Sequence, residues 1–140
     1  MRAIRLVAVA MALVALLVAC GSNSASLTGK TWKLTSATLT GTGSVIPPGV
    51  LPVADSLRYT ITFNDDGTFN AKADCNNVSG SYTTSGNSMT ITLGPTTLVA
   101  CPADSYGDAF TAGLGQVATY AVGANVLTLT TNGGNTMTFN

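Results

Sequence analysis

The sequence of 140 residues contains no histidine and no glutamate, so all six of its acidic residues are aspartates. The lack of histidine removes the usual general base at neutral pH, every catalytic triad that depends on histidine and most zinc sites. Glycine-rich phosphate-binding loops of the G-x-G-x-x-G and P-loop kinds are also missing. A pair of aspartates remains open as a hydrolase mechanism, but nothing in the sequence brings two of them together in space. We therefore predict no catalytic residues, no metal and no cofactor.

Long hydrophobic runs are rare as well, and the one that exists lies at the N-terminus. Residues 6–18 are apolar throughout, and they follow Arg2 and Arg5. Positive charge before a short apolar run is typical of a secretory signal peptide. The run is shorter than the about 20 residues that a membrane-spanning helix needs. We interpret it as an export signal that is later removed.

The end of this run carries a cysteine at a specific position. Leu17-Val18-Ala19-Cys20 resembles a bacterial lipobox, in which the cysteine receives a diacylglyceryl group. In that interpretation residues 1–19 are cleaved off after Ala19, and Cys20 becomes the lipidated N-terminus. The alternative is an ordinary signal peptide in which Cys20 is incidental. Residues 20–26 are predicted to form the lipidated N-terminus and a flexible tether, because only small and polar side chains follow Cys20 in this stretch.

The charge balance argues against two classes of partner. Once Arg2 and Arg5 leave with the signal peptide, four basic and six acidic residues remain, a net charge near −2 (4 − 6). Such a chain has no basic patch for nucleic acid or for anionic lipid. We expect no nucleic-acid partner, and we expect contact with the membrane only through the N-terminal lipid. The predicted location is the bacterial cell envelope, at the outer membrane of a diderm host or the outer face of the cell membrane of a monoderm host.

Three cysteines are an odd number for an exported chain. Lipidation of Cys20 leaves Cys75 and Cys101 as an even pair. In a compartment that permits disulfides, such a pair predicts a bridge. The alternative is two unpaired, buried thiols. The pair is 26 positions apart (101 − 75), which is not the spacing of a redox-active Cys-x-x-Cys motif.

Alternation of apolar and polar residues with a period of two dominates the chain after residue 27, which predicts short strands separated by turns. The predicted strands are 27–34, 57–63, 68–73, 78–84, 88–93, 96–101, 118–122, 126–131 and 135–139. One helix is predicted over Pro102–Leu114, because Tyr106, Phe110 and Leu114 are spaced i, i+4 and i+8. The chain is therefore expected to form a single, mainly β domain over residues 27–140, a β-rich α+β fold with an antiparallel sheet and one helix.

Three features each allow two interpretations. Trp32, the single tryptophan, is either a core anchor or a platform for a ligand. Residues 41–54 hold three prolines within six positions and are predicted to be a long loop, which is either functional or a tolerated insertion. Asp65 and Asp66 lie in the predicted turn Asn64–Gly67, and we favour a hairpin turn over a calcium loop because no further acidic ligands follow at the required spacing.

The most specific pattern in the chain lies between residues 73 and 101. Cys-Asn-Asn, then Gly-x-Tyr, then Thr-x-x-Ala-Cys resembles the META domain, the HslJ-like family of small bacterial envelope proteins, as does the opening Leu-x-Gly-x-x-Trp-x-Leu. The residues that carry the resemblance are Trp32, Cys75, Asn76, Gly80, Tyr82, Thr97, Ala100 and Cys101. The resemblance implies a cracked, barrel-like sheet with the helix packed against it. It also implies a role in stress or drug tolerance for some relatives, without a known chemistry.

Three functions are compatible with these patterns. The first is a non-enzymatic lipoprotein that binds a protein partner or has a structural role in envelope maintenance or stress tolerance. The second is a pilot-like assembly factor that binds a partner peptide, which an apolar cleft lined by Trp32 or by residues 41–54 would favour. The third is a hydrolase, which convergent aspartates with raised pKa values would favour. Asn76 and Asn77 are expected to form side-chain to backbone hydrogen bonds at a turn rather than to bind a ligand.

Overall fold

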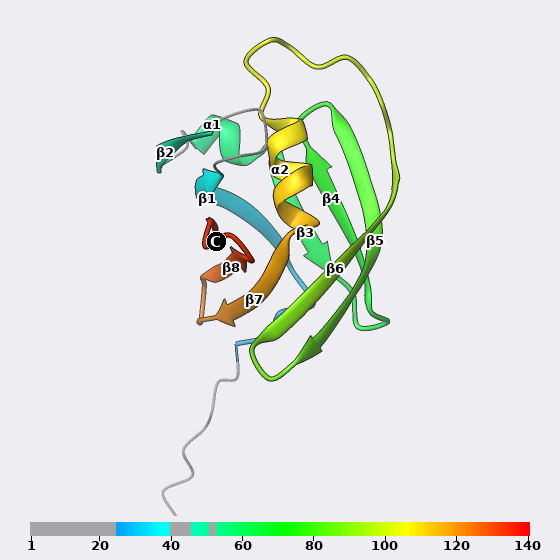
Figure 1. Ribbon diagram of the computed structural model, residues 1–140, viewed down its shortest axis with the longest axis vertical. Coiled ribbons are helices and arrows are strands. Elements are labelled where there is room, and N and C mark those ends of the chain that lie inside the picture. Colours follow the sequence, from blue (N-terminus) through cyan, green and yellow to red (C-terminus); the bar gives the residue numbers. More distant parts are fainter. Residues whose placement is uncertain (1–24, 40–45, 51–52) are drawn as a thin grey trace, which may run out of the picture.

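The computed structural model describes residues 25–39, 46–50 and 53–140 (Figure 1). These residues form nine strands and two helices. In chain order the elements are β1 (Thr31–Leu39), β2 (Ile46–Val50), α1 (Val53–Ser56), β3 (Tyr59–Phe63), β4 (Thr68–Ala73), β5 (Asn76–Ser85), β6 (Ser88–Thr96), α2 (Gly107–Leu114), β7 (Val117–Val122), β8 (Leu127–Thr131) and β9 (Thr136–Phe139). The predicted signal peptide, the cleavage site after Ala19, Cys20 and most of the tether lie outside the described residues.

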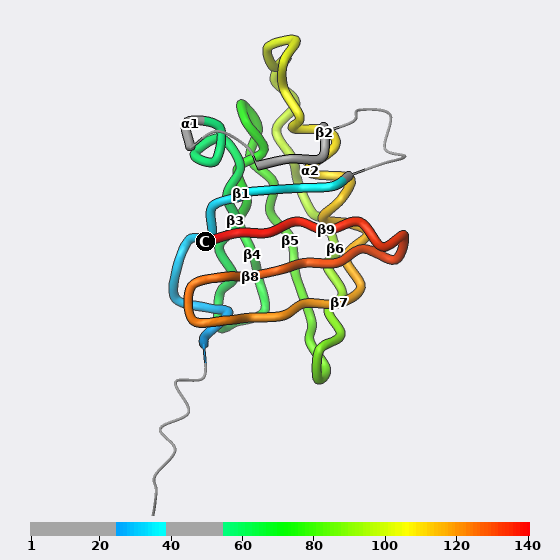
Figure 2. Tube along the Cα trace, turned by 90° about the vertical axis from the view of Figure 1, so that its left-hand side faces the viewer, coloured from blue at the N-terminus to red at the C-terminus, as the bar shows by residue number. Residues whose placement is uncertain are grey.

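The strands form one antiparallel sheet in the order β2-β1-β3-β4-β5-β6-β7-β8-β9, and β1 also pairs with β9. This last pairing closes eight of the strands, all except β2, into a barrel. Figure 2 shows β7, β8, β9 and β1 running across the view, while β3 to β6 run up and down in the opposite wall. The predicted mainly β, antiparallel, barrel-like fold is therefore confirmed.

Strand β1 takes part in both walls because it bends. Its first residues, Thr31–Lys33, pair with β3, and the stretch from Leu34 to Thr38 pairs with β9. A register shift between Leu34 and Ser36 leaves Thr35 as an extra residue at the bend. Such a bulge increases the local twist of a strand, which is how a sheet turns a barrel corner.

The barrel has one narrow join, between β6 and β7. In the part of the chain that the structure describes, a single residue pair, Ser88 with Thr119, links these strands, with a hydrogen bond from Tyr120 N to Asn87 O of 2.9 Å. Helix α2 enters β7 directly and contacts both β1 and β4 (Figure 1). The cracked barrel that the family resemblance implies is therefore a closed barrel in which β6 and β7 are joined by only one pair of the described residues.

The core is made by the inward residues of the strands and by one face of α2. The largest fully buried side chains include Trp32, Tyr59, Phe63, Phe69, Phe110 and Phe139. Trp32 has no exposed surface, and its indole Nε1 donates to the Leu27 carbonyl oxygen at 2.8 Å. It is a core anchor, so the ligand-platform interpretation is wrong.

Two predicted element boundaries are wrong, one because β2 is an edge strand and the other because β6 contains a bulge. Residues 46–50 of the predicted loop form β2, and α1 follows, so the segment 41–54 is not wholly a loop. Strand β2 pairs only with β1, and proline is tolerated at a sheet edge. Gly94 and Pro95 do not end their strand: β6 continues to Thr96, because a bulge opposite Ser79 accommodates them.

The segment before α2 also differs from its prediction. Of the predicted strand 96–101 only Thr96 is a strand residue, as the last residue of β6, and the helix begins at Gly107 rather than at Pro102. Leu93, the last residue of the predicted strand 88–93, leaves 37% of its surface exposed. Leu57, the first residue of the predicted strand 57–63, precedes β3 and is 54% exposed. The apolar stripe within α2 holds, since Phe110 and Leu114 are fully buried.

Candidate interaction surface

A corner of the barrel is tied together where β4 passes into β5. Asp74 has a φ of 62°, a left-handed backbone that turns the chain sharply between the two strands. Cys75 follows and is disulfide-bonded to Cys101, with 5.6 Å between the two Cα atoms. The predicted bridge is confirmed, and the alternative of two free thiols is wrong. We call residues 74–77 together with residues 95–102 the disulfide corner.

Asn76 binds the loop that the disulfide holds. Its Oδ1 accepts from Val99 N at 2.7 Å and from Thr97 Oγ1 at 3.1 Å, and its Nδ2 donates to Val99 O at 3.0 Å. The amide thus pairs with Val99 as a neighbouring strand would. Asn76 makes the side-chain to backbone bonds that the sequence predicts, although with a segment more than twenty residues away. Asn77 uses its main chain instead: its N donates to Thr97 Oγ1 at 2.9 Å and its O accepts from Thr97 N at 3.0 Å.

Three aspartates converge on Arg58 next to this corner. Arg58 donates to both carboxylate oxygens of Asp74, at 2.7 and 2.6 Å, and its Nη1 lies 3.4 Å from Asp55 Oδ1 and 3.3 Å from Asp104 Oδ2. The Arg58 guanidinium holds the pKa of the Asp74 carboxyl below its ordinary value, against the opposing effect of burial. A hydrolytic acid needs a raised pKa, so Asp74 does not fit that role. Among the described residues, no group of three or more such side chains is arranged to hold a metal ion.

The buried end of the corner is closed by α2. Tyr106 N donates to the hydroxyl of Tyr59 at 2.8 Å, and the Tyr59 ring packs edge-on against Phe110 with 5.6 Å between ring centroids. Burial raises the pKa of the Tyr59 hydroxyl above its ordinary value. At Gly107 an added Cβ would lie 2.8 Å from the Ala73 carbonyl oxygen, so only glycine lets α2 start this close to the end of β4.

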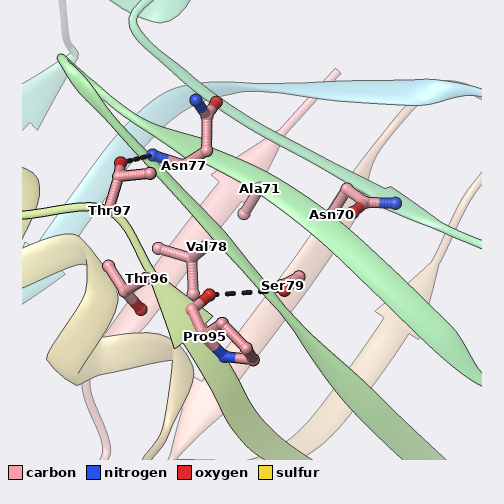
Figure 3. A pocket seen from close by; sticks show the side chains of 8 residues that line it. All are labelled: Asn70, Ala71, Asn77, Val78, Ser79, Pro95, Thr96 and Thr97. Atoms are coloured by element: carbon pink, nitrogen blue, oxygen red, sulfur yellow. Dashed lines mark hydrogen bonds between the residues drawn. The ribbon is translucent and has the colours of Figure 1, made fainter.

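The bulge in β6 opens the first of three clefts around the disulfide corner. It has a volume of about 450 Å³ and lies over β4, β5 and the end of β6 (Figure 3). Its lining residues are Asn70, Ala71, Asn77, Val78, Ser79, Pro95, Thr96 and Thr97. Ser79 Oγ donates to the Pro95 carbonyl oxygen at 3.3 Å, which holds the bulge against β5.

A second cleft lies between α2 and the end of β6, and we call it the Leu98 groove. Its volume is about 320 Å³. It is lined by Ala73, Asn76, Leu93, Thr96, Thr97, Leu98, Gly107, Asp108, Thr111 and Ala112. A third cleft of about 210 Å³ continues it, sharing Asn76 and Asp108 and adding Ala100 and Cys101. The first cleft and the groove share Thr96 and Thr97, so the three clefts are neighbours around the disulfide corner, and we refer to them together as one surface.

Exposed apolar side chains gather at this surface. Of the five large apolar side chains exposed in the described residues, Leu93, Leu98 and Val99 belong to it. Leu98 is 93% exposed and Val99 is 60% exposed. A contiguous exposed apolar patch rimmed by polar groups is typical of an interaction site.

Comparison with known proteins shows the family of the chain. The family model of the META domain matches residues 25–140. The chain belongs to the META domain family. Among curated protein sequences no match is found. The META domain is similar in fold to a DUF4847 family protein from Bacteroides vulgatus, at 18% identity and a TM-score of 0.55 over 81% of this chain and 92% of that one. It is likewise similar to a protein from Burkholderia xenovorans, at 23% identity and a TM-score of 0.63 over 81% of this chain and 82% of that one.

The motif residues of the META domain divide into two groups. Cys75, Asn76, Thr97, Ala100 and Cys101 all lie in the disulfide corner. The others, Trp32, Gly80 and Tyr82, support the barrel. An added Cβ at Gly80 would collide with the Thr92 carbonyl oxygen and lie 2.7 Å from the Phe69 ring, and the Tyr82 hydroxyl donates to Asn64 O at 2.8 Å.

Two motif residues, Asn76 and Thr97, line the Leu98 groove, but its apolar lining is not part of the motif. Leu93, Leu98 and Ala112 belong to none of the patterns in the sequence that resemble the family. Neither α1 nor α2, the helices that the structure describes, has the length and hydrophobicity of a membrane-spanning segment.

Proposed function

We propose that this META domain is the partner-binding part of a membrane-anchored envelope lipoprotein and acts without catalysis. The observation that carries the proposal is the Leu98 groove. Fully burying a leucine side chain is favourable by about 1.5–3 kcal/mol, so a 93% exposed Leu98 beside an apolar cleft gains stabilisation only when a partner covers it. The disulfide and the Asn76 hydrogen bonds hold the loop in place, which lowers the entropy lost on binding.

A role without catalysis is supported by the chemistry around the corner. Three of the six aspartates surround Arg58, and the lowered pKa of Asp74 keeps that carboxylate charged at neutral pH. The sequence contains no histidine to serve as a base in their place.

An envelope location is supported by the lipobox pattern ending at Cys20 and by the disulfide, which is typical of exported proteins. A diacylglyceryl group supplies the two chains that stable anchoring needs. The described chain starts at the end of the molecule opposite the loop that precedes α2 (Figures 1 and 2). An N-terminal anchor would therefore hold the Leu98 groove away from the membrane, where a partner has access to it.

A pilot-like assembly factor is the second candidate, because such a protein needs a groove for a peptide. The Leu98 groove supports it, although Trp32 does not line the groove. The two candidates share one test, since both require a partner at Leu98.

The test is cross-linking of the tagged full chain in living cells, with Leu98→Asp compared with Val126→Asp. Val126 is 46% exposed and lines none of the three clefts, so it is a matched control. We expect one protein adduct that Leu98→Asp abolishes and Val126→Asp keeps. Adducts that are identical in all three chains, or lost in both variants, would contradict the proposal. Anchoring is tested separately: Cys20→Ser should release the protein from membranes washed with high salt.

A further inference from the structure

The Leu98 groove has one charged residue on its rim. Asp108, in the first turn of α2, lines both the groove and the third cleft that continues it. Its side chain is exposed. All ion pairs among the described residues are made by Arg58 with other aspartates, so Asp108 has no cationic partner there. An apolar floor therefore meets an unpaired negative charge at one end.

Two main-chain donors of the loop are used within the protein. Thr97 N donates to Asn77 O at 3.0 Å, and Val99 N donates to the Asn76 side chain at 2.7 Å. These two donors are already used and do not take part in binding. The side chains that the groove offers to a partner are apolar ones at Leu93, Leu98 and Ala112, together with the charge of Asp108. A volume of about 320 Å³ lies at the lower end of the range for small-ligand sites, so the groove accepts side chains and not a whole helix.

We propose that the Leu98 groove recognises a segment of a partner protein in which an apolar side chain stands next to a lysine or arginine. The apolar side chain enters between Leu93 and Leu98, and the cation pairs with Asp108. The inference rests on the proposed function and names the partner's chemistry. Charge complementarity favours this occupant over a second copy of the chain or an anionic lipid, because like charges in contact are unfavourable and opposite charges steer association.

The same charge argument disfavours two other occupants. A second copy docked groove to groove would bring its own Asp108 against the Asp108 of the first, and Arg58 already faces three aspartates. An anionic lipid headgroup would meet the Asp108 carboxylate directly. A basic, apolar peptide segment meets no such repulsion.

The experiment selects peptides without assuming a sequence. The full chain, reconstituted in phosphatidylcholine vesicles, is used to select from a random peptide display library. The same selection is run on Asp108→Lys and on Asp65→Lys. Asp65 is an exposed aspartate in the turn between β3 and β4 and serves as the matched control. A peptide enriched on the unmodified protein is then synthesised with its cation as lysine, glutamate or norleucine.

We expect peptides with an apolar–basic pair on the unmodified protein and on Asp65→Lys, and apolar–acidic pairs on Asp108→Lys. Exchange of lysine for glutamate should weaken binding to the unmodified protein about fivefold or more and strengthen binding to Asp108→Lys. Leu98→Ser should weaken every enriched peptide. This reversal of preference is unaffected by a small loss of stability in the variant.

Three results of the peptide selection would overturn the inference, and one result of another kind would do so too. The three are enrichment without charge preference, a preference unchanged by Asp108→Lys, and no enrichment above bare vesicles. Self-association of the protein that Leu98→Ser abolishes would also overturn it, in favour of a second copy. If Leu98→Asp removes the cellular adduct while Asp108→Lys leaves peptide preference unchanged, the proposed function stands and only this inference fails.

Discussion

Removal of the Cys75–Cys101 bridge should lower the free energy of unfolding by about 3.5 kcal/mol. The bridge closes a loop of 26 positions, and the chain-entropy model converts that length into about 12 cal/mol/K of entropy returned to the unfolded chain. Domains of this size have a free energy of unfolding of about 5–15 kcal/mol, so the bridge supplies a large share. With an unfolding entropy of about 0.24 kcal/mol/K, the loss corresponds to a fall of about 15 °C in Tm.

The folded structure should survive the change. Asn76 still bonds Val99 and Thr97, and Arg58 still pairs with Asp104 on the same loop. The loss therefore lies mainly in the unfolded state, which makes the size of the effect a test of the loop-length argument.

The assay is thermal unfolding followed by circular dichroism on the oxidised protein and on the double variant Cys75→Ala/Cys101→Ala. Wild-type protein reduced and alkylated under denaturing conditions, then refolded, controls for the loss of the sulfur atoms. Mass spectrometry under non-reducing conditions verifies that the wild type has no free thiols at these positions. A fall in Tm smaller than about 5 °C in both samples would refute the entropic reasoning while leaving the bond itself intact.

Three further predictions concern single residues. Asn76→Ala removes both side-chain bonds to Val99, so it should destabilise the domain by about 1–3 kcal/mol and speed hydrogen exchange at the Val99 amide. Asp74 has a lowered pKa in the folded state, so its ion pair contributes fully above about pH 5 and is lost as the pH falls below about 4; urea unfolding should show Asp74→Asn to be less stable at pH 7, with the gap closing towards pH 2. Gly80→Ala should cost about 1–3 kcal/mol in chemical unfolding because its Cβ has no room, whereas Gly123→Ala, with its nearest neighbour at 3.7 Å, should stay within about 1 kcal/mol.

The sequence predicts those parts of the fold that depend on local alternation. In β4 the residues Phe69, Ala71 and Ala73 are buried and their neighbours are exposed, as the period of two requires. The start of α2 was missed because proline at Pro102 suits a first helical turn, whereas the disulfide at Cys101 keeps that segment in the corner. Tertiary constraint overrode a local preference there.

The candidate site was predictable in part. The bridge followed from counting cysteines, and the Arg58–Asp74 pair could have been found from the hairpin register, since Tyr59 stands opposite Ala73 and the next residues outward are Arg58 and Asp74. The exposure of Leu98 could not be predicted from residue counts or from hairpin register. It depends on how the closed barrel leaves the loop after β6 uncovered, and barrel closure is set by pairing between distant strands rather than by local pattern.

The pairing of β1 with β9 has a consequence for the order of events during biogenesis. Strand β1 pairs with β2 and β3 and also with β9, the last strand to be synthesised, about a hundred residues later, so the closing contacts have a high sequence separation. Such contacts form slowly, because the chain loses loop entropy before they form. A nascent chain that lacks its last strand cannot complete the barrel. Under the export that we propose for this protein, the late pairing of β1 with β9 would keep the barrel open until the last strand has crossed the membrane.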